Sequence, residues 1–291
     1  MNEDEFFCQN SNIFSRNELF WGKSAQELLR TKHVAVFGLG GVGGFCAEAL
    51  ARAGVGELTI VDFDTVSLSN INRQIIALHS TIGESKVRLF EKRLKDINPE
   101  IKLNVVEDFY TGNSHSEHNI LSYFANAQDD KGEESLKSFN FVADAIDTMR
   151  SKISLLETCV NNGIPVISSM GAGNRIDPTQ LYISDISEIK NKNAPFVSNI
   201  IYQLKKRGIE NGITVVASRE KPFVMEKISG TEKITTKNGE QIEFTKITPA
   251  STPFVASCAG IFMAYYIVNK IIKNNPPLEG GSKSLISGWS K

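Results

Sequence analysis

Short apolar stretches recur along the first 170 residues, and most are followed by a longer stretch whose apolar residues are spaced three and four apart. The first kind is typical of buried parallel strands, and the second of helices that pack one face on a core. The pattern predicts strands at 33–37, 57–62, 101–106, 140–146 and 164–168, and helices at 42–53, 84–97 and about 151–161. Alternating strands and helices favour right-handed crossovers within a parallel sheet. We therefore predict an α/β fold with a Rossmann-like, mostly parallel sheet and helices on both faces.

The pattern changes after Gly171, where loops alternate with strand-like runs at 215–218, 223–228 and 242–247. An apolar stretch follows at 254–272. Its uninterrupted core is shorter than the about 20 residues that a membrane span needs, and its small residues permit close helix packing. We expect a buried helix, either in the core or in a dimer interface. Association with a membrane through this stretch is the alternative.

A chain of 291 residues allows one large domain or two ordinary ones. We predict a single domain over residues 1–275, together with C-terminal strands and the hydrophobic helix. Its nucleotide-binding half would be 11–170, and its crossover and substrate half 171–275. Residues 276–291 are expected to form a flexible tail. Polar residues dominate 111–138, which predicts an exposed insertion.

Composition and charge exclude several classes of protein. Hydrophobic residues make up 41% and charged residues 22%, which argues against disorder. The net charge of -1 excludes a globally basic nucleic-acid coat, but not a local basic patch. The four cysteines form no Cys-x-x-Cys pair, so a zinc ribbon is not indicated. Because the acidic N-terminus lacks an apolar signal segment, we expect a cytoplasmic protein.

A glycine loop stands between the first predicted strand and the first predicted helix. Gly38, Gly40 and Gly43 fit G-x-G-x-x-G, in which the chain turns tightly and its backbone approaches a phosphate at a helix N-terminus. Asp62 ends the second strand, where a carboxylate can accept hydrogen bonds from ribose hydroxyls. Together these features predict a nucleotide site. The alternative is a loop rich in glycine beside a solvated acid.

The segment that follows Asp62 does not suit a dehydrogenase, although a dehydrogenase would share the glycine loop. FDTVSLSNINRQ brings Asp64, Asn70 and Arg73 into one irregular stretch, and Lys86 opens the next helix. Arginine binds phosphate through two hydrogen bonds and lysine binds it as a point charge, so these cations indicate additional phosphates. Taken singly, each cation is better explained as a solvated surface residue, the usual location of Lys and Arg.

Two acids, Asp144 and Asp147, lie where the fourth predicted strand ends. The carboxyl ends of parallel strands form the binding crevice of such sheets. A carboxylate there can hold a magnesium ion that bridges phosphates. Asp147 comes last and is the better candidate for a metal ligand, whereas Asp144 could be a hydrogen-bonded structural acid.

These motifs together resemble a known family. GLGGVGG, VDFDTVSLSNINRQ, Lys86 in GESK and Asp147 in AIDT are similar to the ubiquitin-activating-enzyme-like adenylyltransferases, the ThiF/MoeB/HesA group, over roughly residues 11–275. The NxNRQ segment is specific to that family, and the glycine loop is not. The resemblance implies a homodimer that uses ATP and Mg²⁺ to activate a carboxylate as an acyl-adenylate.

The resemblance also implies roles for matching residues. Carried over by position, the nucleotide would be bound by Gly38, Gly40, Gly41, Gly43, Asp62, Asp64, Asn70, Arg73 and Lys86. Asp147 would bind Mg²⁺, and the catalytic set would be Arg73, Lys86, Asp147 and Arg16. The last of these would reach the ATP of the partner subunit. From the residues alone, a solvated N-terminal arginine is an equal alternative for Arg16.

Within the family, the stretches 168–187, 204–222 and 252–264 resemble a branch that dehydrates threonylcarbamoyladenosine in tRNA. The resemblance implies ring closure inside the modification, with no catalytic cysteine. It makes tRNA the partner, and a cysteine-desulfurase or sulfur-acceptor system a further candidate. Basic residues of the C-terminal half could contact RNA phosphates: Lys190, Lys192, Lys205, Lys206 and Arg207.

Three other functions remain as alternatives. The same chemistry could act on the C-terminus of a sulfur-carrier protein, although the paired zinc cysteines of such enzymes are missing. A nucleotide-binding scaffold without catalysis would not need the set formed by Arg73, Lys86 and Asp147. An NAD-dependent dehydrogenase is disfavoured by the SNINRQ segment.

Overall fold

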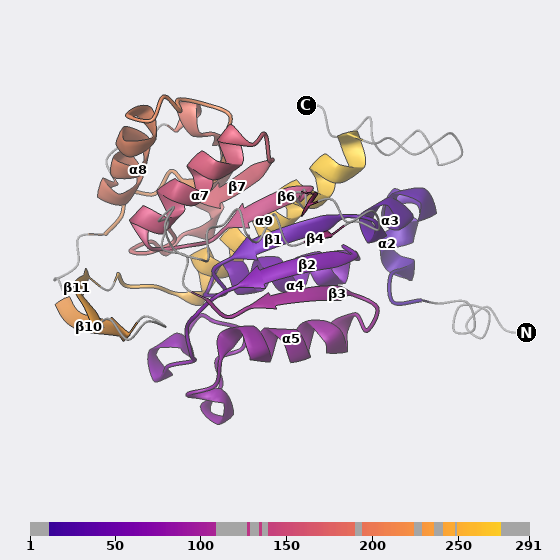
Figure 1. Ribbon diagram of the computed structural model, residues 1–291, viewed down its shortest axis with the longest axis horizontal. Helices are drawn as coiled ribbons and strands as arrows, with labels where there is room; N and C mark the ends of the chain where they lie inside the picture. The colour runs from indigo at the N-terminus through magenta and orange to yellow at the C-terminus, as the bar shows by residue number, and fades with distance from the viewer. Residues whose placement is uncertain are drawn as a thin grey trace, which may run out of the picture.

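A seven-stranded sheet forms the centre of the protein, in the order β3-β2-β1-β6-β7-β9-β8 (Figure 1). The structure is a computed structural model that describes residues 12–108, 127–128, 134–135, 139–189, 194–223, 229–235, 241–247 and 249–274. The seven strands are β1 His33–Phe37, β2 Glu57–Val61, β3 Lys102–Val106, β6 Phe141–Asp144, β7 Val166–Ser169, β8 Leu181–Asp185 and β9 Thr214–Ser218. All neighbours are parallel except β8 and β9. The predicted mostly parallel sheet is therefore confirmed.

Helices cover both faces of this sheet (Figure 1). They are α2 Ser15–Trp21, α3 Lys23–Arg30, α4 Gly43–Ala53, α5 Lys86–Ile97, α7 Met149–Asn161, α8 Pro195–Lys205 and α9 Pro253–Asn274. Strand side chains alternate between two cores: Val34 and Val36 join α4, α5 and α9 on one face, while Ala35 and Phe37 join α7 and α8 on the other. The burial of all five β1 residues follows from this two-sided cover.

Short elements complete the described chain. The 3-10 helices are η1 Leu68–Asn70, η2 His79–Thr81, η3 Pro178–Gln180 and η4 Ile186–Glu188. Two small antiparallel pairs are β4 Ala127–Gln128 with β5 Glu134–Ser135, and β10 Ser229–Thr235 with β11 Gln241–Ile247. Apart from β4 and β5, most of the predicted insertion at 111–138 lies outside the described residues, and so does the whole tail at 276–291.

The order of the strands reverses between β1 and β6. From β1 the chain proceeds outward to β2 and β3, and it then returns to build β6, β7 and β9 on the other side. Adjacent strand ends, Phe37 of β1 and Asp144 of β6, are partners in register. Open α/β sheets bind ligands beyond the carboxyl ends of the strands at such a reversal. The fold therefore places the loop after β1 beside the loop after β6, with a Cβ on Gly38 only 2.9 Å from the Ala145 carbonyl oxygen, and the nucleotide crevice is expected between these loops.

Helix α9 lies in the core, as expected for a buried helix. By length and composition this helix could cross a membrane. However, 50% of its most apolar 18-residue stretch is buried inside the protein. Its buried side chains, among them Val255, Ala259 and Met263, join the core that α4 shares with the sheet. The small residues noted in the sequence thus permit the close contact of α9 with α4.

Gly260 allows α9 to approach α4 closely. A Cβ atom at this position would lie 2.2 Å from the Val42 carbonyl oxygen and 3.0 Å from the Cys46 nitrogen. We expect Gly260→Ala to lower the free energy of unfolding by about 1–3 kcal/mol, because the two helices must separate. Denaturant unfolding measures the effect, with Lys273→Ala at an exposed position of α9 as the control. An unchanged unfolding midpoint for Gly260→Ala would contradict the close approach.

Several elements were not predicted from the sequence. The chain after Gly171 forms β8 and helix α8, where only loops and strand-like runs were expected. Helix α8 begins with Pro195 at its first position and buries Val197, Ile200 and Leu204, a spacing of three and four residues that is helical. Two helices, α2 and α3, also precede the first strand. The strand-like runs at 215–218 and 242–247 do belong to strands β9 and β11.

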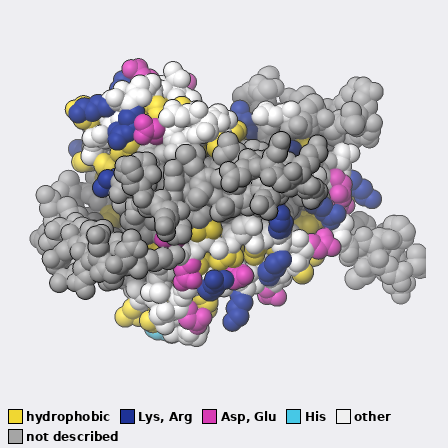
Figure 2. Space-filling model, viewed as in Figure 1, with side chains coloured by type: hydrophobic (Ala, Val, Ile, Leu, Met, Phe, Trp, Pro, Cys, Tyr) yellow, Lys and Arg dark blue, Asp and Glu magenta, His cyan; other side chains and the backbone are white. Residues whose placement is uncertain are grey.

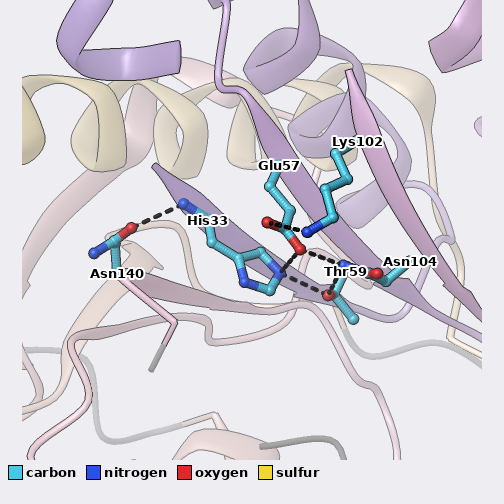
Figure 3. Close-up of polar contacts among 6 residues, drawn as sticks. All are labelled: His33, Glu57, Thr59, Lys102, Asn104 and Asn140. Atoms are coloured by element: carbon cyan, nitrogen blue, oxygen red, sulfur yellow. Dashed lines mark hydrogen bonds and ion pairs between the residues drawn. The ribbon is translucent and has the colours of Figure 1, made fainter. Parts of the chain in front are cut away.

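The amino ends of the strands carry a network of polar contacts, opposite the crevice (Figure 3). The backbone N–H of His33 donates to Asn140 Oδ1 at 2.8 Å, and its ring Nε2 lies 2.8 Å from Thr59 Oγ1. Glu57 accepts hydrogen bonds from Asn104 Nδ2 at 2.7 Å and from the Lys102 ammonium at 3.2 Å. These contacts tie β1, β2 and β3 to the residues before β6 and fix their register.

The described surface carries charges of both signs. In Figure 2, lysine and arginine side chains are interspersed with aspartate and glutamate on the visible face. This agrees with the net charge of -1 and with the exclusion of a globally basic surface.

Candidate active site

The glycine loop connects β1 to α4 at the crevice. Gly38 has a φ of 84°, and a Cβ there would lie 2.9 Å from the Ala145 carbonyl oxygen. A Cβ on Gly43 would lie 1.8 Å from the Gly38 carbonyl oxygen, so the turn closes only with glycine at this position. At Gly40 the nearest atom to such a Cβ is 3.7 Å away. The loop therefore packs tightly against the protein at Gly38 and Gly43. It leaves space at Gly40, where a phosphate can approach the backbone.

Asp62 fixes the loop from the end of β2. Its Oδ2 accepts a hydrogen bond from the Leu39 N–H at 2.5 Å, and its Oδ1 accepts one from the Asp64 N–H at 2.8 Å. Burial raises the pKa of Asp62 above its ordinary value, although the charge of Lys86 acts in the opposite direction. Each carboxylate oxygen has a second lone pair, which a ribose hydroxyl can use.

The NINRQ segment starts at the 3-10 helix η1. Asn70 is buried, and its Oδ1 accepts a hydrogen bond from the Ser67 N–H at 3.1 Å, so that the side chain caps the turn. Only its amide Nδ2 is left to donate to a phosphate. Asn72 donates from Nδ2 to the Ser251 carbonyl oxygen at 2.8 Å, which ties this segment to the residues before α9.

Arg73 lies within electrostatic reach of Asp147. Its Nη1 donates to the Ser69 carbonyl oxygen at 2.8 Å and to Asn72 Oδ1 at 2.9 Å, and its Cγ lies 3.2 Å from the Cβ position of Gly41. Burial lowers the pKa of Arg73 and the charge of Asp147 raises it, so the two groups share one electrostatic environment. The guanidinium keeps its charge in any case, since its ordinary pKa lies far above neutrality.

Lys86 is the first residue of α5 and is only 4% exposed. Its Nζ pairs with Asp64 Oδ2 at 2.8 Å, and its backbone N–H donates to the Asp64 carbonyl oxygen at 3.0 Å. The Asp64 side chain is 44% exposed, so this end of the ion pair faces solvent. A phosphate could therefore approach the ammonium from the crevice while Asp64 keeps it oriented.

Asp147 is exposed in the loop between β6 and α7, as expected for the last acid of this strand. Within the described residues, no three or more His, Cys, Asp or Glu side chains gather into a metal cluster. One carboxylate suits Mg²⁺, which usually takes one or two protein carboxylates and completes its shell with phosphates and water. The donor set therefore fits a magnesium ion that arrives with a nucleotide.

Asp144 has a different environment and does not face the crevice. It is fully buried, and its Oδ2 pairs with Lys152 Nζ at 2.6 Å and accepts a hydrogen bond from Ser168 Oγ at 2.6 Å. Its Oδ1 accepts a hydrogen bond from the Ile146 N–H at 3.1 Å, which orders the loop that carries Asp147. The expectation of a structural acid at this position is confirmed.

Gln74 is a candidate that was absent from the predicted site residues. It is 7% exposed, and among the described residues its Oε1 has no hydrogen-bond partner. Its Nε2 lies 3.7 Å from the Cβ position of Gly40, so the carboxamide faces the loop where a nucleotide is expected. A buried acceptor without a donor is unfavourable. A ligand that supplies the donor would remove that cost, and only the NRQ triplet itself pointed to this residue.

Arg16 is not brought into the crevice of its own chain. It is an exposed residue of α2, and its neighbour Asn17 donates from Nδ2 to the Arg52 carbonyl oxygen at 3.0 Å. Arg52 lies in the last turn of α4, whose other end begins at the glycine loop. The 11 residues of α4 span about 16 Å, which separates Arg16 from that loop.

The comparisons with known proteins agree with this geometry. The model of the ThiF family matches residues 14–280, and the chain therefore belongs to the ThiF family. The chain is similar to the tRNA threonylcarbamoyladenosine dehydratase of Bacillus subtilis, with 40% identity over 261 residues that cover 90% of this chain and 95% of that protein. The expected resemblance to this family and to its dehydratase branch is confirmed.

Solved structures of an Escherichia coli relative are also similar. The tRNA N6-threonylcarbamoyladenosine dehydratase of that organism, TcdA, in complex with AMP, matches with a TM-score of 0.74 and 28% identity, over 90% of this chain and 94% of that chain. The same enzyme in complex with ATP matches with a TM-score of 0.71 and 29% identity, over 90% and 94%. In these relatives the fold is therefore combined with adenine nucleotides.

Proposed function

We propose that this protein catalyses the ATP-dependent dehydration of N6-threonylcarbamoyladenosine in tRNA, through an acyl-adenylate. One observation carries the proposal. In a chain that is 40% identical to such a dehydratase, the glycine loop contacts Asp62 and Arg73, and the charges of Lys86 and Asp147 act on these two residues beside the strand reversal. The dehydratase is an enzyme of the adenylating ThiF class, and the site contains the groups that this chemistry needs.

The chain's own residues bind and orient ATP in the first step. The glycine loop approaches the phosphates at the N-terminus of α4, and Asp62 accepts hydrogen bonds from the ribose. Arg73 and Lys86 balance the negative charge that develops as the threonine carboxylate attacks the α-phosphorus. A magnesium ion held by Asp147 would neutralise further phosphate charge and help pyrophosphate to leave. Such preoriented charges stabilise a transition state more than mobile ones do.

The second step closes a ring within the modified base. A nucleophilic atom of the modification attacks the activated carbonyl carbon and releases its proton to solvent, the bond to AMP breaks, and AMP leaves with one former carboxylate oxygen. Because nucleophile and carbonyl belong to one molecule, their effective concentration is high and no protein nucleophile is needed. The overall loss of water is thus driven by cleavage of ATP to AMP and pyrophosphate.

The cysteines should be dispensable for this reaction. Cys46 and Cys159 are buried, and burial raises the pKa of both thiols, which makes them poor nucleophiles. Cys258 lies in α9, and Cys8 lies outside the described residues. We expect a variant with all four cysteines replaced by alanine to retain at least about half of the wild-type dehydration rate if it folds. A folded variant that forms the adenylate but no longer closes the ring would contradict this expectation.

We propose further that the protein is a homodimer in which Arg16 completes the ATP site of the partner subunit. Arg16 lies too far from its own glycine loop, and a borrowed cation can couple catalysis to assembly, as arginine fingers do. We expect mixtures of inactive Arg16→Ala and Arg73→Ala subunits to regain activity, because the mixed dimer contains one intact site. If mixed dimers form and stay inactive, Arg16 does not act in trans.

The RNA would contact a basic surface of the C-terminal half. Lys205, Lys206 and Arg207 end helix α8 or follow it and are exposed, although Arg207 also pairs with Glu157 at 3.1 Å. Lys190 and Lys192 lie outside the described residues. Affinity for tRNA should fall with salt as such contacts are lost.

A cytoplasmic location and a link to a cysteine-desulfurase or sulfur-acceptor system belong to the same proposal.

The proposal is tested in cells that carry or lack the gene. Mass spectrometry of nucleosides from total tRNA should show the cyclic, dehydrated form with the gene, and only threonylcarbamoyladenosine without it. The Lys86→Ala gene should behave as the deletion. If both strains contain the same nucleosides, with no other adenylating enzyme present, the protein acts on another carboxylate. The C-terminus of a sulfur-carrier protein is then the next substrate to examine.

A further inference from the structure

Three large apolar side chains are more than half exposed around one end of the crevice. Ile176, Phe223 and Phe254 are 52%, 56% and 55% exposed, and we call them the rim residues. Isolated exposed apolar residues are common, but residues gathered beside a functional site mark a binding surface. The structure shows how three segments that are distant in the sequence bring the rim residues together.

Asn174 is the centre of this arrangement. Its carbonyl oxygen accepts a hydrogen bond from the Phe223 N–H at 2.8 Å. Its own N–H donates to the Ala250 carbonyl oxygen at 2.7 Å, and its Oδ1 accepts a hydrogen bond from the Ala250 N–H at 2.8 Å. Asn174 holds a left-handed φ of 58° to make these contacts. The loop after β7, the segment after β9 and the residues before α9 are thereby joined.

The joined segments continue directly into the nucleotide crevice. The Ser251 carbonyl oxygen accepts the hydrogen bond from Asn72, the residue before Arg73. In the first turn of α9, the Cβ of Ala256 lies 3.3 Å from the Cβ position of Gly41. Phe254 stands between these two contacts in the sequence. The rim residues therefore belong to the same wall as the loop and the arginine that would hold ATP.

The charge around Phe223 is basic. Arg219 and Lys221 precede it, Lys221 is exposed, and the Arg219 guanidinium lies over the Tyr182 ring at 4.9 Å. The carboxylate of Glu220, which lies between them, accepts hydrogen bonds from the Ile176 and Asp177 N–H groups at 3.1 Å. Glu220, the only acid within residues 219–223, is therefore turned toward the backbone, and the two cations lie close in sequence to the exposed ring.

We propose that Phe223 and Phe254 stack against unpaired bases of the RNA substrate, beside the modified adenosine, and that Lys221 contacts a phosphate. This inference rests on the proposed function. A modified base must leave its stack to bring the carboxylate to ATP, and aromatic side chains replace the lost stacking. Aromatic rings next to cations are the usual means of binding single-stranded nucleic acid without reading its sequence.

The test uses the full-length protein and a synthetic anticodon stem-loop RNA as the probe. Phe223→Ala and Phe254→Ala should each weaken RNA binding about 5- to 150-fold, the effect of losing one stacked base. Phe→Tyr at the same positions should bind as the wild type, because the ring is kept. ATP affinity should not change. Lys221→Ala should reduce the slope of log K against log salt by about one phosphate contact.

Tyr265→Ala provides the matched control, since this exposed aromatic residue lies on α9 but away from the crevice end of the helix. Light scattering of each variant reports assembly. Normal RNA binding by the Phe223→Ala and Phe254→Ala variants would overturn the proposal. So would weakened binding that appears only together with loss of the dimer, because the rim would then be an interface between copies. Leucine variants that bind as tightly as the wild type would exclude stacking.

The two proposals can fail separately. If the wild-type protein dehydrates the tRNA and the alanine variants bind RNA normally, only the stacking role is wrong. If the wild-type protein neither binds nor dehydrates the tRNA, the proposed function is wrong and the stacking role is overturned with it.

Discussion

Lys86→Ala and Arg73→Ala should each slow adenylate formation roughly 10²- to 10³-fold, the effect of removing one preoriented charge from a transition state. Both cations are held in place before any ligand arrives. Lys86 is 4% exposed and paired with Asp64, and Arg73 is bound to the Ser69 carbonyl oxygen and to Asn72. Release of pyrophosphate in the presence of tRNA measures the rate.

The controls separate catalysis from folding. Lys86→Met keeps the volume of the buried stem without the charge, and we expect it to fold and to be as slow as Lys86→Ala. Lys92→Ala removes an exposed lysine from the same helix and should have no effect. If Lys86→Met and Arg73→Ala, both folded, turn over at nearly the wild-type rate, the crevice is not the adenylation site.

Asp147→Asn should lower activity and Asp144→Asn should lower stability, although the two acids are only three residues apart. Asp147 is exposed, so its amide should leave stability unchanged and lower magnesium-dependent activity about 10- to 100-fold or more, with partial recovery at high Mg²⁺. Asp144 is paired with the fully buried Lys152. Its amide leaves a buried ammonium without a counter-charge and should lower the free energy of unfolding by about 3–5 kcal/mol.

Two measurements on each variant distinguish these effects: denaturant unfolding, and the rate as a function of Mg²⁺ concentration. The molecules of Asp144→Asn that remain folded should show nearly the same dependence of rate on Mg²⁺ concentration as the wild type. If Asp147→Asn is fully active and insensitive to added Mg²⁺, Asp147 is not the metal ligand. Asp64, which is half-exposed in the same crevice, would then be the next acid to replace.

The sheet and the glycine loop could be predicted because local patterns determine them. Strand β1 is five buried residues followed by glycines, and Gly38 and Gly43 are needed by the backbone itself. Helix α8 was not predicted because its apolar residues include the β-branched Val197, Ile200 and Ile201, which are also common in strands. Tertiary packing decides between the two structures there.

Contacts between distant residues could not be read from the sequence. Asn72 binds Ser251 across 179 residues, and Asn174 binds Ala250 across 76. Lys152 has the sequence of an ordinary helix surface residue, yet it is completely buried against Asp144 and Ser168. Such partners depend on which strands become neighbours, and only the folded chain determines that. Of the predicted site residues, Asp62 and Asp147 follow strands β2 and β6, which the sequence could indicate, whereas the distance of Arg16 from its own glycine loop depends on how α2 packs.

The most direct test of the whole account is the mass of the modified nucleoside after one incubation. Purified protein, ATP, Mg²⁺ and tRNA that carries threonylcarbamoyladenosine are combined. The tRNA is then digested, and the masses of its nucleosides are measured by mass spectrometry. With the threonine carboxylate labelled with oxygen-18, the account predicts a nucleoside lighter by one labelled water and AMP that contains one labelled oxygen. An unchanged nucleoside, or a dehydrated one accompanied by unlabelled AMP, would contradict it.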